Sequence, residues 1–334
     1  MSSLFRLGII IDPIETLNPF KDSTVGMIRA AKARQWDVSL FDLNALRATE
    51  QGLHSKGIRV QSLNEHRLET KPTHHQASTP DWLEAESIDM NLAELDLMLM
   101  RKDPPYSTTY HFTCQLLSQL ERHGVLVSNS PQSLRDCNEK LFALQFPDCT
   151  TPTLVSSHLS DFASFAIEHG TIIIKPLDGM GGQGIFKVDE QQTNLPVIVE
   201  MLSQSGQFPI MAQRYLPAIQ HGDKRVLMIN GEAIPYLLAR IPQQGDIRGN
   251  LAAGGKGVVQ ALTQTEQAIC DRVGPVLRNK GIHFAGLDII GDRLTEINIT
   301  SPTCIREIER ETQLDIAGAL LDHLFTQCNR ADSR

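Results

Sequence analysis

Two stretches of the sequence decide its fold and its chemistry: Lys175-Pro-Leu-Asp-Gly-Met-Gly-Gly-Gln-Gly184 and Gly286-Leu-Asp288-Ile-Ile-Gly-Asp-Arg-Leu-Thr-Glu296-Ile-Asn298. The first places a lysine at the end of an apolar run, directly before a glycine-rich loop. A lysine and bare backbone N–H groups can hold phosphate oxygens. The second places Asp, Glu and Asn side chains on a predicted β-hairpin, and such oxygen ligands suit Mg²⁺. Together the two stretches predict a site for a metal-bound polyphosphate, and hence an ATP-using enzyme.

The register of the acidic hairpin determines whether its polar side chains converge. Residues two apart in a strand share a face, so Glu296 and Asn298 project the same way. If residues 291–293 form a three-residue loop, Asp288 lies opposite Glu296 on that face, whereas a two-residue loop would place it on the other face. A solvated polar face is the usual place for such residues, but the isoleucines around them indicate an apolar hairpin, where unpaired carboxylates would be costly. We therefore expect a metal site on this hairpin, which Asp288 would join if the loop has three residues.

The glycine loop admits a second interpretation, because Gly179-Met-Gly181-Gly-Gln-Gly184 also satisfies the G-x-G-x-x-G pattern of dinucleotide-binding folds. Glu200 lies near the position expected for an acid that binds ribose. That pattern requires a helix directly after the glycines. Residues 185–188 instead alternate like a strand, which favours a flexible strand–loop–strand flap over the phosphates. A helix after Gly184 would revive the alternative, an oxidoreductase.

A second glycine-rich segment, residues 241–257, contains Arg248 and Lys256. It is no Walker A loop, because no Ser or Thr follows Lys256 and its first glycine is out of place. We interpret it as a mobile lid. The guanidinium group of arginine can donate two parallel hydrogen bonds to a carboxylate or to a phosphoryl group that gains charge, so Arg225, Arg240 and Arg248 are candidate catalytic residues. A single arginine is more often the partner in a surface salt bridge.

Composition narrows the class of protein. A chain of 334 residues suggests two or three domains, and its net charge of −8 argues against nucleic acid as a partner. The apolar runs fall far short of the roughly 20 residues of a membrane span, and the N-terminus leads into a strand pattern, so we expect a cytoplasmic protein without a membrane partner. The six cysteines form no C-x-x-C pair and show no zinc-ligand spacing, which is typical of reduced, buried thiols.

Strands and helices are predicted to alternate in an N-terminal α/β domain that ends near residue 130. Residues 50–80 lack periodicity and are interpreted as an irregular excursion, where the pair His74-His75 is not expected to bind metal. A small unit with a hairpin follows, then an extended connector over 210–217. The other expected strands are 7–11, 38–41, 95–100, 126–128, 171–175, 185–188, 224–229 and 232–240, and the expected helices are 23–35, 108–123, 160–169, 196–204, 265–280 and one from about 315.

Several further motifs make the chain resemble bacterial glutathione synthetases, members of the ATP-grasp superfamily. The resemblance spans almost the whole chain except residues 50–90. The motifs are Arg101-Lys-Asp-Pro-Pro105, Ser130-Pro-Gln-Ser-Leu-Arg-Asp-Cys137, Asn138-Glu-Lys140-Leu-Phe, Ile174-Lys175-Pro-Leu-Asp-Gly-Met-Gly-Gly, Gly222-Asp-Lys-Arg225, Ala239-Arg240-Ile-Pro, Arg248-Gly-Asn-Leu-Ala-Ala-Gly-Gly and Gly286 through Glu307.

The resemblance implies an N-terminal parallel-sheet α/β domain (1–130) before a two-subdomain ATP-grasp fold, with a central lid subdomain (131–216) and a C-terminal subdomain (217–330) that carries the metal site and the mobile loop 241–257. ATP would lie between the two subdomains. Mg²⁺, with Mn²⁺ as an alternative, would be held by Asp288, Glu296 and Asn298. The expected nucleotide-binding residues are Lys140, Lys175, Gly179, Gly181, Gly182, Gln213, Tyr215, Leu216 and Asp223.

The resemblance further implies that γ-glutamylcysteine and glycine are joined through an acyl phosphate to give glutathione, ADP and phosphate. Arg225, Arg240 and Arg248 would neutralise the carboxylate and the transferring phosphoryl group, and Cys304 would not be catalytic. Family members are typically homotetramers. Two alternatives stay open: an ATP-grasp ligase that joins other substrates, and a nucleotide-binding protein without turnover.

Overall fold

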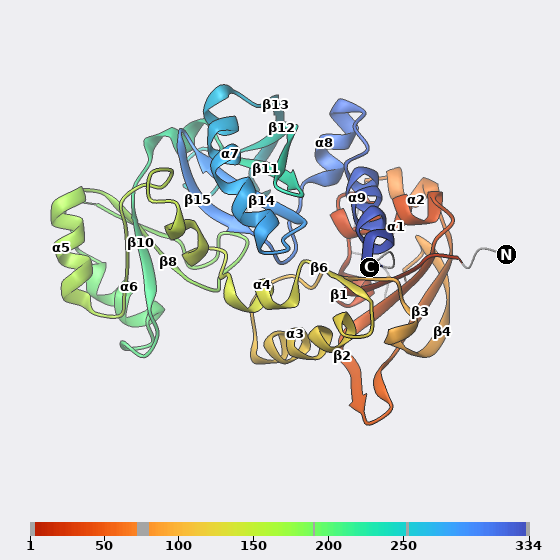
Figure 1. Ribbon diagram of the computed structural model, residues 1–334. Helices are drawn as coiled ribbons and strands as arrows, with labels where there is room; N and C mark the ends of the chain where they lie inside the picture. The colour runs from red at the N-terminus through yellow and green to blue at the C-terminus, as the bar shows by residue number, and fades with distance from the viewer. Residues whose placement is uncertain (1–3, 72–79, 190, 252–253, 332–334) are drawn as a thin grey trace.

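The fold comprises three β-sheets with their covering helices, and the computed structural model describes residues 4–71, 80–189, 191–251 and 254–331 (Figure 1). The N-terminal sheet has the order β4-β3-β2-β1-β5-β6. β1, β2, β5 and β6 pair in parallel, while β3 and β4 pair antiparallel at one edge. Its strands are β1 (Arg6–Ile11), β2 (Asp37–Thr49), β3 (Gly52–Leu63), β4 (Leu83–Asn91), β5 (Leu97–Met100) and β6 (Leu126–Ser128).

Helices cover both faces of this sheet, as the apolar character of its parallel strands requires. Alternate residues of β1 face opposite ways: Leu7, Ile9 and Ile11 pack in the core beneath α1 and α9, and Ile10 packs in the core beneath α3. Asp22 begins α1 by accepting hydrogen bonds from the N–H groups of Thr24 and Val25. The helices are α1 (Ser23–Ala33), α2 (Glu65–Glu69), α3 (Thr108–Glu121), α4 (Pro131–Asp136) and the C-terminal α9 (Ile316–Ala331).

The interpretation of residues 50–80 as irregular was wrong for most of the described part. Strands β2 and β3 form a long antiparallel hairpin in which Thr49 pairs with Gly52, and α2 follows. Residues 72–79, including the pair His74-His75, lie outside the described residues. The sequence lacks an alternating pattern here because much of β3 and β4 is exposed on both faces, where polar side chains such as those of the Arg59–Glu86 ion pair are tolerated.

The middle sheet is fully antiparallel, with the order β7-β10-β8-β9 and a core of its own beneath α5 and α6. The extended connector predicted over 210–217 begins with the central strand β10. β9 pairs antiparallel with β8, which confirms the strand–loop–strand prediction around the glycine loop and excludes the dinucleotide interpretation. The elements are β7 (Thr153–Ser156), α5 (Leu159–His169), β8 (Ile172–Pro176), β9 (Phe186–Val188), α6 (Leu195–Leu202) and β10 (Ile210–Arg214).

The C-terminal sheet has the order β13-β12-β11-β14-β15 and is also antiparallel. α7 packs on one face and α8 on the other, and α9 then returns to the N-terminal sheet beside α1, where Arg34 pairs with Asp322 at 2.7 Å (Figure 1). The elements are β11 (Asp223–Ile229), β12 (Glu232–Ile241), β13 (Lys256–Ala261), α7 (Gln264–Asn279), β14 (Phe284–Ile290), β15 (Arg293–Asn298) and α8 (Ile305–Thr312), with short 3₁₀ helices at Ile14–Thr16, Leu92–Glu94, Leu141–Gln145 and Pro217–His221.

The loop of the acidic hairpin is the shorter of the two that the sequence allows. Ile290 pairs with Arg293, so residues 291–292 form a two-residue loop. Asp288 nevertheless pairs with Glu296, because the register shifts by one residue and Thr295 becomes an extra residue on β15. The hydroxyl of Thr295 donates to the carbonyl of Asp288 at 3.1 Å. This β-bulge restores the shared face that the longer loop was expected to provide.

The partly buried His283 predicts acid sensitivity of folding. Burial and the neighbouring His323, whose Nε2 lies 3.2 Å from His283 Nδ1, lower the pKa of His283 to about 4. Because the pKa of His283 is lower in the folded than in the unfolded chain, the neutral imidazole stabilises the fold above about pH 6.5. This contribution to the free energy of unfolding, at most about 3 kcal/mol, is lost as the pH falls towards 4. The difference between the free energies of unfolding in urea at pH 7.5 and at pH 5 measures this loss. We expect His283→Gln to reduce it and His123→Gln, at an exposed site, to leave it unchanged; equal losses in both variants would contradict the assignment.

Candidate active site

A cavity of about 400 Å³ lies where the middle sheet, the C-terminal sheet and the N-terminal domain meet. Every residue predicted for the site lines it, although the predictions came from segments far apart in the sequence. These residues are Lys140, Lys175, Gly179, Gly181, Gly182, Gln213, Tyr215, Leu216, Asp223, Arg225, Arg240, Arg248, Asp288, Glu296 and Asn298.

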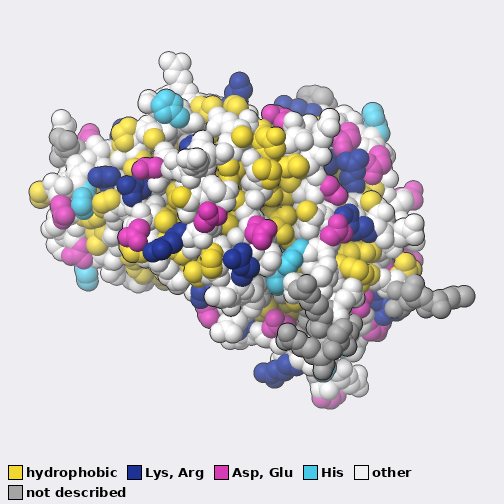
Figure 2. All heavy atoms as spheres, turned by 45° about the horizontal axis from the view of Figure 1, so that its top comes forward, with side chains coloured by type: hydrophobic (Ala, Val, Ile, Leu, Met, Phe, Trp, Pro, Cys, Tyr) yellow, Lys and Arg dark blue, Asp and Glu magenta, His cyan; other side chains and the backbone are white. Residues whose placement is uncertain are grey.

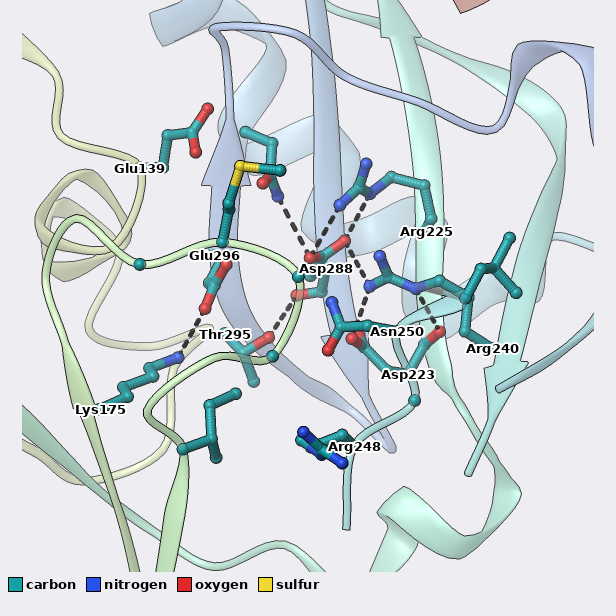
Figure 3. A pocket seen from close by; sticks show the side chains of 18 of the residues that line it. Glu139, Lys175, Asp223, Arg225, Arg240, Arg248, Asn250, Asp288, Thr295 and Glu296 are labelled. Atoms are coloured by element: carbon teal, nitrogen blue, oxygen red, sulfur yellow. Dashed lines mark hydrogen bonds and ion pairs between the residues drawn. The ribbon is translucent and has the colours of Figure 1, made fainter. Parts of the chain in front are cut away.

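Lys175 and Glu296 join the two sides of the cavity. Lys175 Nζ, from the end of β8, donates to Glu296 Oε1, from β15, at 2.8 Å (Figure 3). Lys140 Nζ lies 3.9 Å from the same oxygen and donates to the carbonyl of Gly179 at 2.8 Å. Both lysine side chains are only 6% exposed. Burial alone would raise the pKa of Glu296, but Lys140 and Lys175 lower it, so the carboxylate is charged at neutral pH.

Asp288 is held by two buried arginines. Arg225 donates to it from Nε at 2.6 Å and from Nη2 at 3.0 Å, and Arg240 Nη2 lies 2.9 Å from Oδ1. The amide of Asn298 donates to Oδ2 at 3.2 Å. Although burial opposes the charged form, the two guanidinium groups hold the pKa of Asp288 well below its usual range.

Asp223 is the least satisfied carboxylate of this cluster. Its Oδ2 accepts from Arg240 at 2.5 Å, while Oδ1 is buried and has no hydrogen-bond partner. Burial raises the pKa of Asp223 to about 7, despite the nearby Arg240. A buried acceptor without a partner is costly, so Oδ1 is available to a donor group on a ligand.

The charges around the cavity favour a polyanion. Lys140, Lys175, Arg225 and Arg240 contribute four buried cations, against the carboxylates of Asp223, Asp288 and Glu296. Within this buried cluster the cations outnumber the carboxylates by four to three. In a poorly hydrated site such a surplus attracts phosphate oxygens more strongly than it would in water.

The oxygen ligands fit a hard divalent cation that arrives with phosphates. Asp288, Glu296 and Asn298 share one face of the hairpin, as their pairing shows. Within the described ranges no group of three or more His, Cys, Asp or Glu residues could hold a metal ion. Mg²⁺ commonly takes only one or two carboxylates plus substrate phosphates, and this donor set matches that requirement.

Arg248 occupies a different position from the other two candidate arginines. Its side chain is 39% exposed and pairs with Asp246 of the same loop at 2.8 Å, away from the buried carboxylates. It meets the glycine loop instead: a Cβ placed on Gly182 would lie 3.1 Å from Arg248 Cδ and 2.9 Å from Asn250 Oδ1. The described part of the 241–257 loop and the glycine loop therefore touch over the cavity.

Gly182→Ala should disrupt this contact. Gly182 has φ +83°, where a side chain is strained, and the added methyl would collide with Asn250. We expect kcat/KM to fall by about 10- to 100-fold, because the glycine loop and the 241–257 loop could no longer meet in their present positions over the cavity. Steady-state kinetics measure the loss, with Gly245→Ala as the control: Gly245 also has a positive φ, but no atom lies within 4 Å of an added Cβ. Equal losses in the two variants would show that backbone strain alone is responsible.

Several lining residues were not predicted. Glu139 accepts hydrogen bonds from the N–H groups of Ile299 and Thr300 and from the Thr300 hydroxyl at 2.7–3.0 Å, and so fixes the chain after β15. Its place beside Lys140 in the Asn138-Glu-Lys140 motif could have indicated it. The other unpredicted polar or charged residues of interest are Asn18, Lys21, Asp103, Asn250, Thr303 and Glu307, from segments that carry no local pattern.

Comparisons with known proteins assign both parts of the chain to one family. Residues 5–135 match the family model described as prokaryotic glutathione synthetase, N-terminal domain, and residues 139–313 match its ATP-grasp domain. The chain is 52% identical over 322 residues to the glutathione synthetase of Pseudomonas aeruginosa, covering 96% of this chain and 98% of the relative. It is 46% identical over 320 residues to that of Escherichia coli O157:H7, with the same coverage of both chains.

Solved structures show the same fold at low sequence identity. D-cycloserine synthetase DcsG is similar with a TM-score of 0.65 at 11% identity, covering 96% of this chain and 99% of the other. The ATP-grasp ligase PsnB, in a complex with Mg and ADP, gives a TM-score of 0.61 at 19% identity, covering 96% and 98%. The arrangement of the three sheets is thus shared with ATP-grasp ligases.

Proposed function

Because the chain belongs to the prokaryotic glutathione synthetase family, we propose that the cavity is the active site in which its ligation reaction occurs. The enzyme is an ATP-grasp ligase of ATP-dependent glutathione synthesis. The observation that carries the assignment is the 2.8 Å contact between Lys175 and Glu296, since it brings the cationic and acidic parts of the site together across one cavity.

In our proposal the nucleotide lies between the middle and C-terminal sheets. Lys140, Lys175 and the backbone N–H groups of the glycine loop hold its phosphates. Gln213, Tyr215 and Leu216 line the cavity at the end of β10 and lie along the adenine. The free Oδ1 of Asp223 accepts a hydrogen bond from a hydroxyl of the nucleotide. Asp288, Glu296 and Asn298 would hold Mg²⁺, or Mn²⁺ in its place, which would neutralise phosphate charge during transfer.

The reaction has two steps, and neither needs a protein nucleophile. An oxygen of the cysteinyl carboxylate of γ-glutamylcysteine attacks the γ-phosphorus of ATP, and the bond to the ADP oxygen breaks. The amine of glycine then attacks the carbonyl carbon of the acyl phosphate, loses a proton, and expels phosphate. Arg225 and Arg240 orient the carboxylate and neutralise the transferring group. Arg248 lies at the loop contact and excludes water from the acyl phosphate.

Release of ADP tests this function. We expect ADP to form only when ATP, γ-glutamylcysteine, glycine and Mg²⁺ are all present, and glutathione to accumulate in equal amount. Chelation of the metal should stop the reaction. Turnover only with other amino-acid pairs would indicate a related ATP-grasp ligase, and binding of ATP without ADP formation would indicate a protein that binds nucleotide only.

Lys175→Ala should mainly raise the ATP requirement. The lysine holds a phosphate through a charge-assisted hydrogen bond worth about 1.5–3 kcal/mol, so we expect the KM for ATP to rise about 10- to 100-fold. The KM for glycine should change little. Initial rates with ATP varied measure the effect, and Lys56→Ala, at an exposed position of β3, is the control. An unchanged KM for ATP would remove Lys175 from the phosphate site.

Assembly and location are further parts of the proposal. A homotetramer is expected from the family resemblance, and sedimentation of the purified chain would test it. No helix within the described ranges is long and apolar enough to span a membrane. A cytoplasmic location stays a prediction.

A further inference from the structure

Strand β15 lies at one edge of the C-terminal sheet and carries two of the three proposed metal ligands, Glu296 and Asn298. Pairing with β14 satisfies the backbone of β15 on one side only. On the other side the N–H group of Ile297, between the two ligands, donates to the carbonyl of Glu139 at 2.9 Å. The segment around Glu139 therefore takes the place of a further neighbouring strand.

The side chain of Glu139 holds the chain directly after Asn298. Its Oε1 accepts hydrogen bonds from the N–H groups of Ile299 and Thr300 at 2.9 and 3.0 Å, and from the hydroxyl of Thr300 at 2.7 Å. Hydrogen bonds to a carboxylate are roughly twice as strong as those between neutral groups. The backbone is thus fixed on both sides of Asn298, before it by the carbonyl of Glu139 and after it by the carboxylate.

Glu139 is itself presented from a fixed backbone. The side chain of Asn138 accepts hydrogen bonds at 3.0 and 3.1 Å from the two N–H groups at the start of the 3₁₀ helix Leu141–Gln145. This helix packs on β15, and Phe142 and Ile297 belong to the same buried apolar core. Because the support is rigid, a change of the Glu139 side chain should act on β15 and not on the segment that carries it.

Asn298 needs this support, because its own contacts orient the side chain weakly. The amide nitrogen donates to the carbonyl of Gly286 and to Asp288 Oδ2, both at 3.2 Å, which leaves the amide oxygen as the atom that can bind a cation. Mg²⁺ demands nearly ideal octahedral geometry and tolerates little displacement of a ligand. The position of the main chain at Asn298 therefore decides whether its oxygen can reach the metal.

The contacts of Glu139 argue against direct binding of metal by this residue. A carboxylate oxygen offers about two lone-pair sites, and three donors already surround Oε1. Figure 3 shows Glu139 on a separate segment, apart from the side chains that converge on Asp288. The carboxylate is thus committed to the backbone of the hairpin.

Resting on the function proposed above, we propose that Glu139 is a positioning residue of the metal site and acts through Asn298. By holding the main chain at 297 and at 299–300, it places the amide oxygen of Asn298 for the metal–nucleotide complex and touches neither metal nor substrate. The next residue, Lys140, holds the glycine loop at the carbonyl of Gly179, at 2.8 Å. One short segment therefore links the two sides of the nucleotide site.

Amide hydrogen exchange in the metal-free protein tests the first step. In Glu139→Ala the N–H groups of Ile299 and Thr300 lose a charged acceptor, so we expect their exchange, resolved by NMR, to become about 10- to 100-fold faster. Leu294 is the internal control, because its N–H group donates to the carbonyl of Cys149 on the same edge of β15, at 2.8 Å. Unchanged exchange at 299 and 300, or equal acceleration at 294, would overturn the proposal.

Metal affinity tests the second step without turnover. Electron paramagnetic resonance of Mn²⁺, titrated into enzyme that holds a non-hydrolysable ATP analogue, measures the Kd of the metal. Glu139→Ala should raise this Kd about 10- to 100-fold, as loss of a residue that orients a metal ligand does. Glu139→Gln keeps an oxygen acceptor in the same place and should return the Kd to within about threefold of wild type. Glu168→Ala, at a side chain on α5 that is 75% exposed, is the control and should leave it unchanged.

A double-mutant cycle separates positioning from direct metal binding. Once Asn298→Ala has removed the ligand, adding Glu139→Ala should raise the Kd of Mn²⁺ by less than about twofold more. Full additivity of the two losses, or a wild-type Kd in Glu139→Ala, would refute the positioning role and leave the proposed function intact. A wild-type Kd in Asn298→Ala would refute the metal assignment of the proposed function, and the role of Glu139 with it.

Discussion

Glu296→Ala is expected to reduce turnover at least about 1,000-fold, because it removes a predicted metal ligand and the acceptor of Lys175 at the same time. The loss should appear in kcat and persist at saturating ATP and Mg²⁺, since added metal cannot replace a missing ligand. Initial rates of ADP release at increasing Mg²⁺ measure it.

Asp292→Ala is the matched control for this variant. Asp292 lies in the loop of the same hairpin, its side chain is 67% exposed, and it forms a weak ion pair with Arg293 at 3.5 Å. We expect wild-type activity from it. Near-normal turnover by Glu296→Ala at saturating Mg²⁺ would show that the metal ligands have been assigned wrongly.

Arg225→Ala is expected to cost both activity and stability. The guanidinium group makes two hydrogen bonds to Asp288 and faces the cavity where the substrate carboxylate is proposed to bind. Its loss should lower kcat about 100- to 1,000-fold, as removal of a group that stabilises developing charge does. Breaking a buried ion pair costs about 3–5 kcal/mol, and we expect the lower end because Arg240 still holds Asp288.

Two comparisons separate these effects of Arg225. Arg225→Lys keeps the positive charge but lacks the planar guanidinium group that donates two hydrogen bonds. It should therefore recover most of the free energy of unfolding but little of kcat. Arg272→Ala, on the exposed face of α7 with a weak contact to Asp148 at 3.4 Å, should change neither. Urea unfolding and steady-state kinetics on the same samples measure both quantities. Full activity in Arg225→Ala would exclude it from the reaction.

The sequence predicted the elements that carry strong local signals. The lysine before the glycines, the strand after them and the acidic hairpin each follow from a short pattern, and the structure brings their side chains to one cavity. The convergence of Asp288 with Glu296 was expected only with a three-residue loop, whereas the loop has two residues. A bulge at Thr295 produced it, and no residue type in this stretch demands a bulge, so the sequence offered no signal for it.

Other features depend on contacts between distant segments and leave no local pattern. Strands β3 and β4 lie at one side of the N-terminal sheet and expose many polar side chains, so their residues resemble a loop. Helix α9 was predicted, but its packing beside α1 at the opposite end of the chain was not. Lys21, Asp103 and Glu307 line the cavity from three separated segments that only the tertiary fold assembles. The proposed domain limits and the roles of the individual site residues stay predictions.

A crystal structure with Mg²⁺ and a non-hydrolysable ATP analogue tests the central claim most directly. We predict the triphosphate in the cavity between β8 and the β14–β15 hairpin, with Lys175 Nζ within hydrogen-bond distance of a phosphate oxygen and oxygens of Asp288 and Glu296 bound to the metal. A nucleotide bound elsewhere, or phosphates in this cavity that contact neither Lys175 nor a metal held by these carboxylates, would contradict the account.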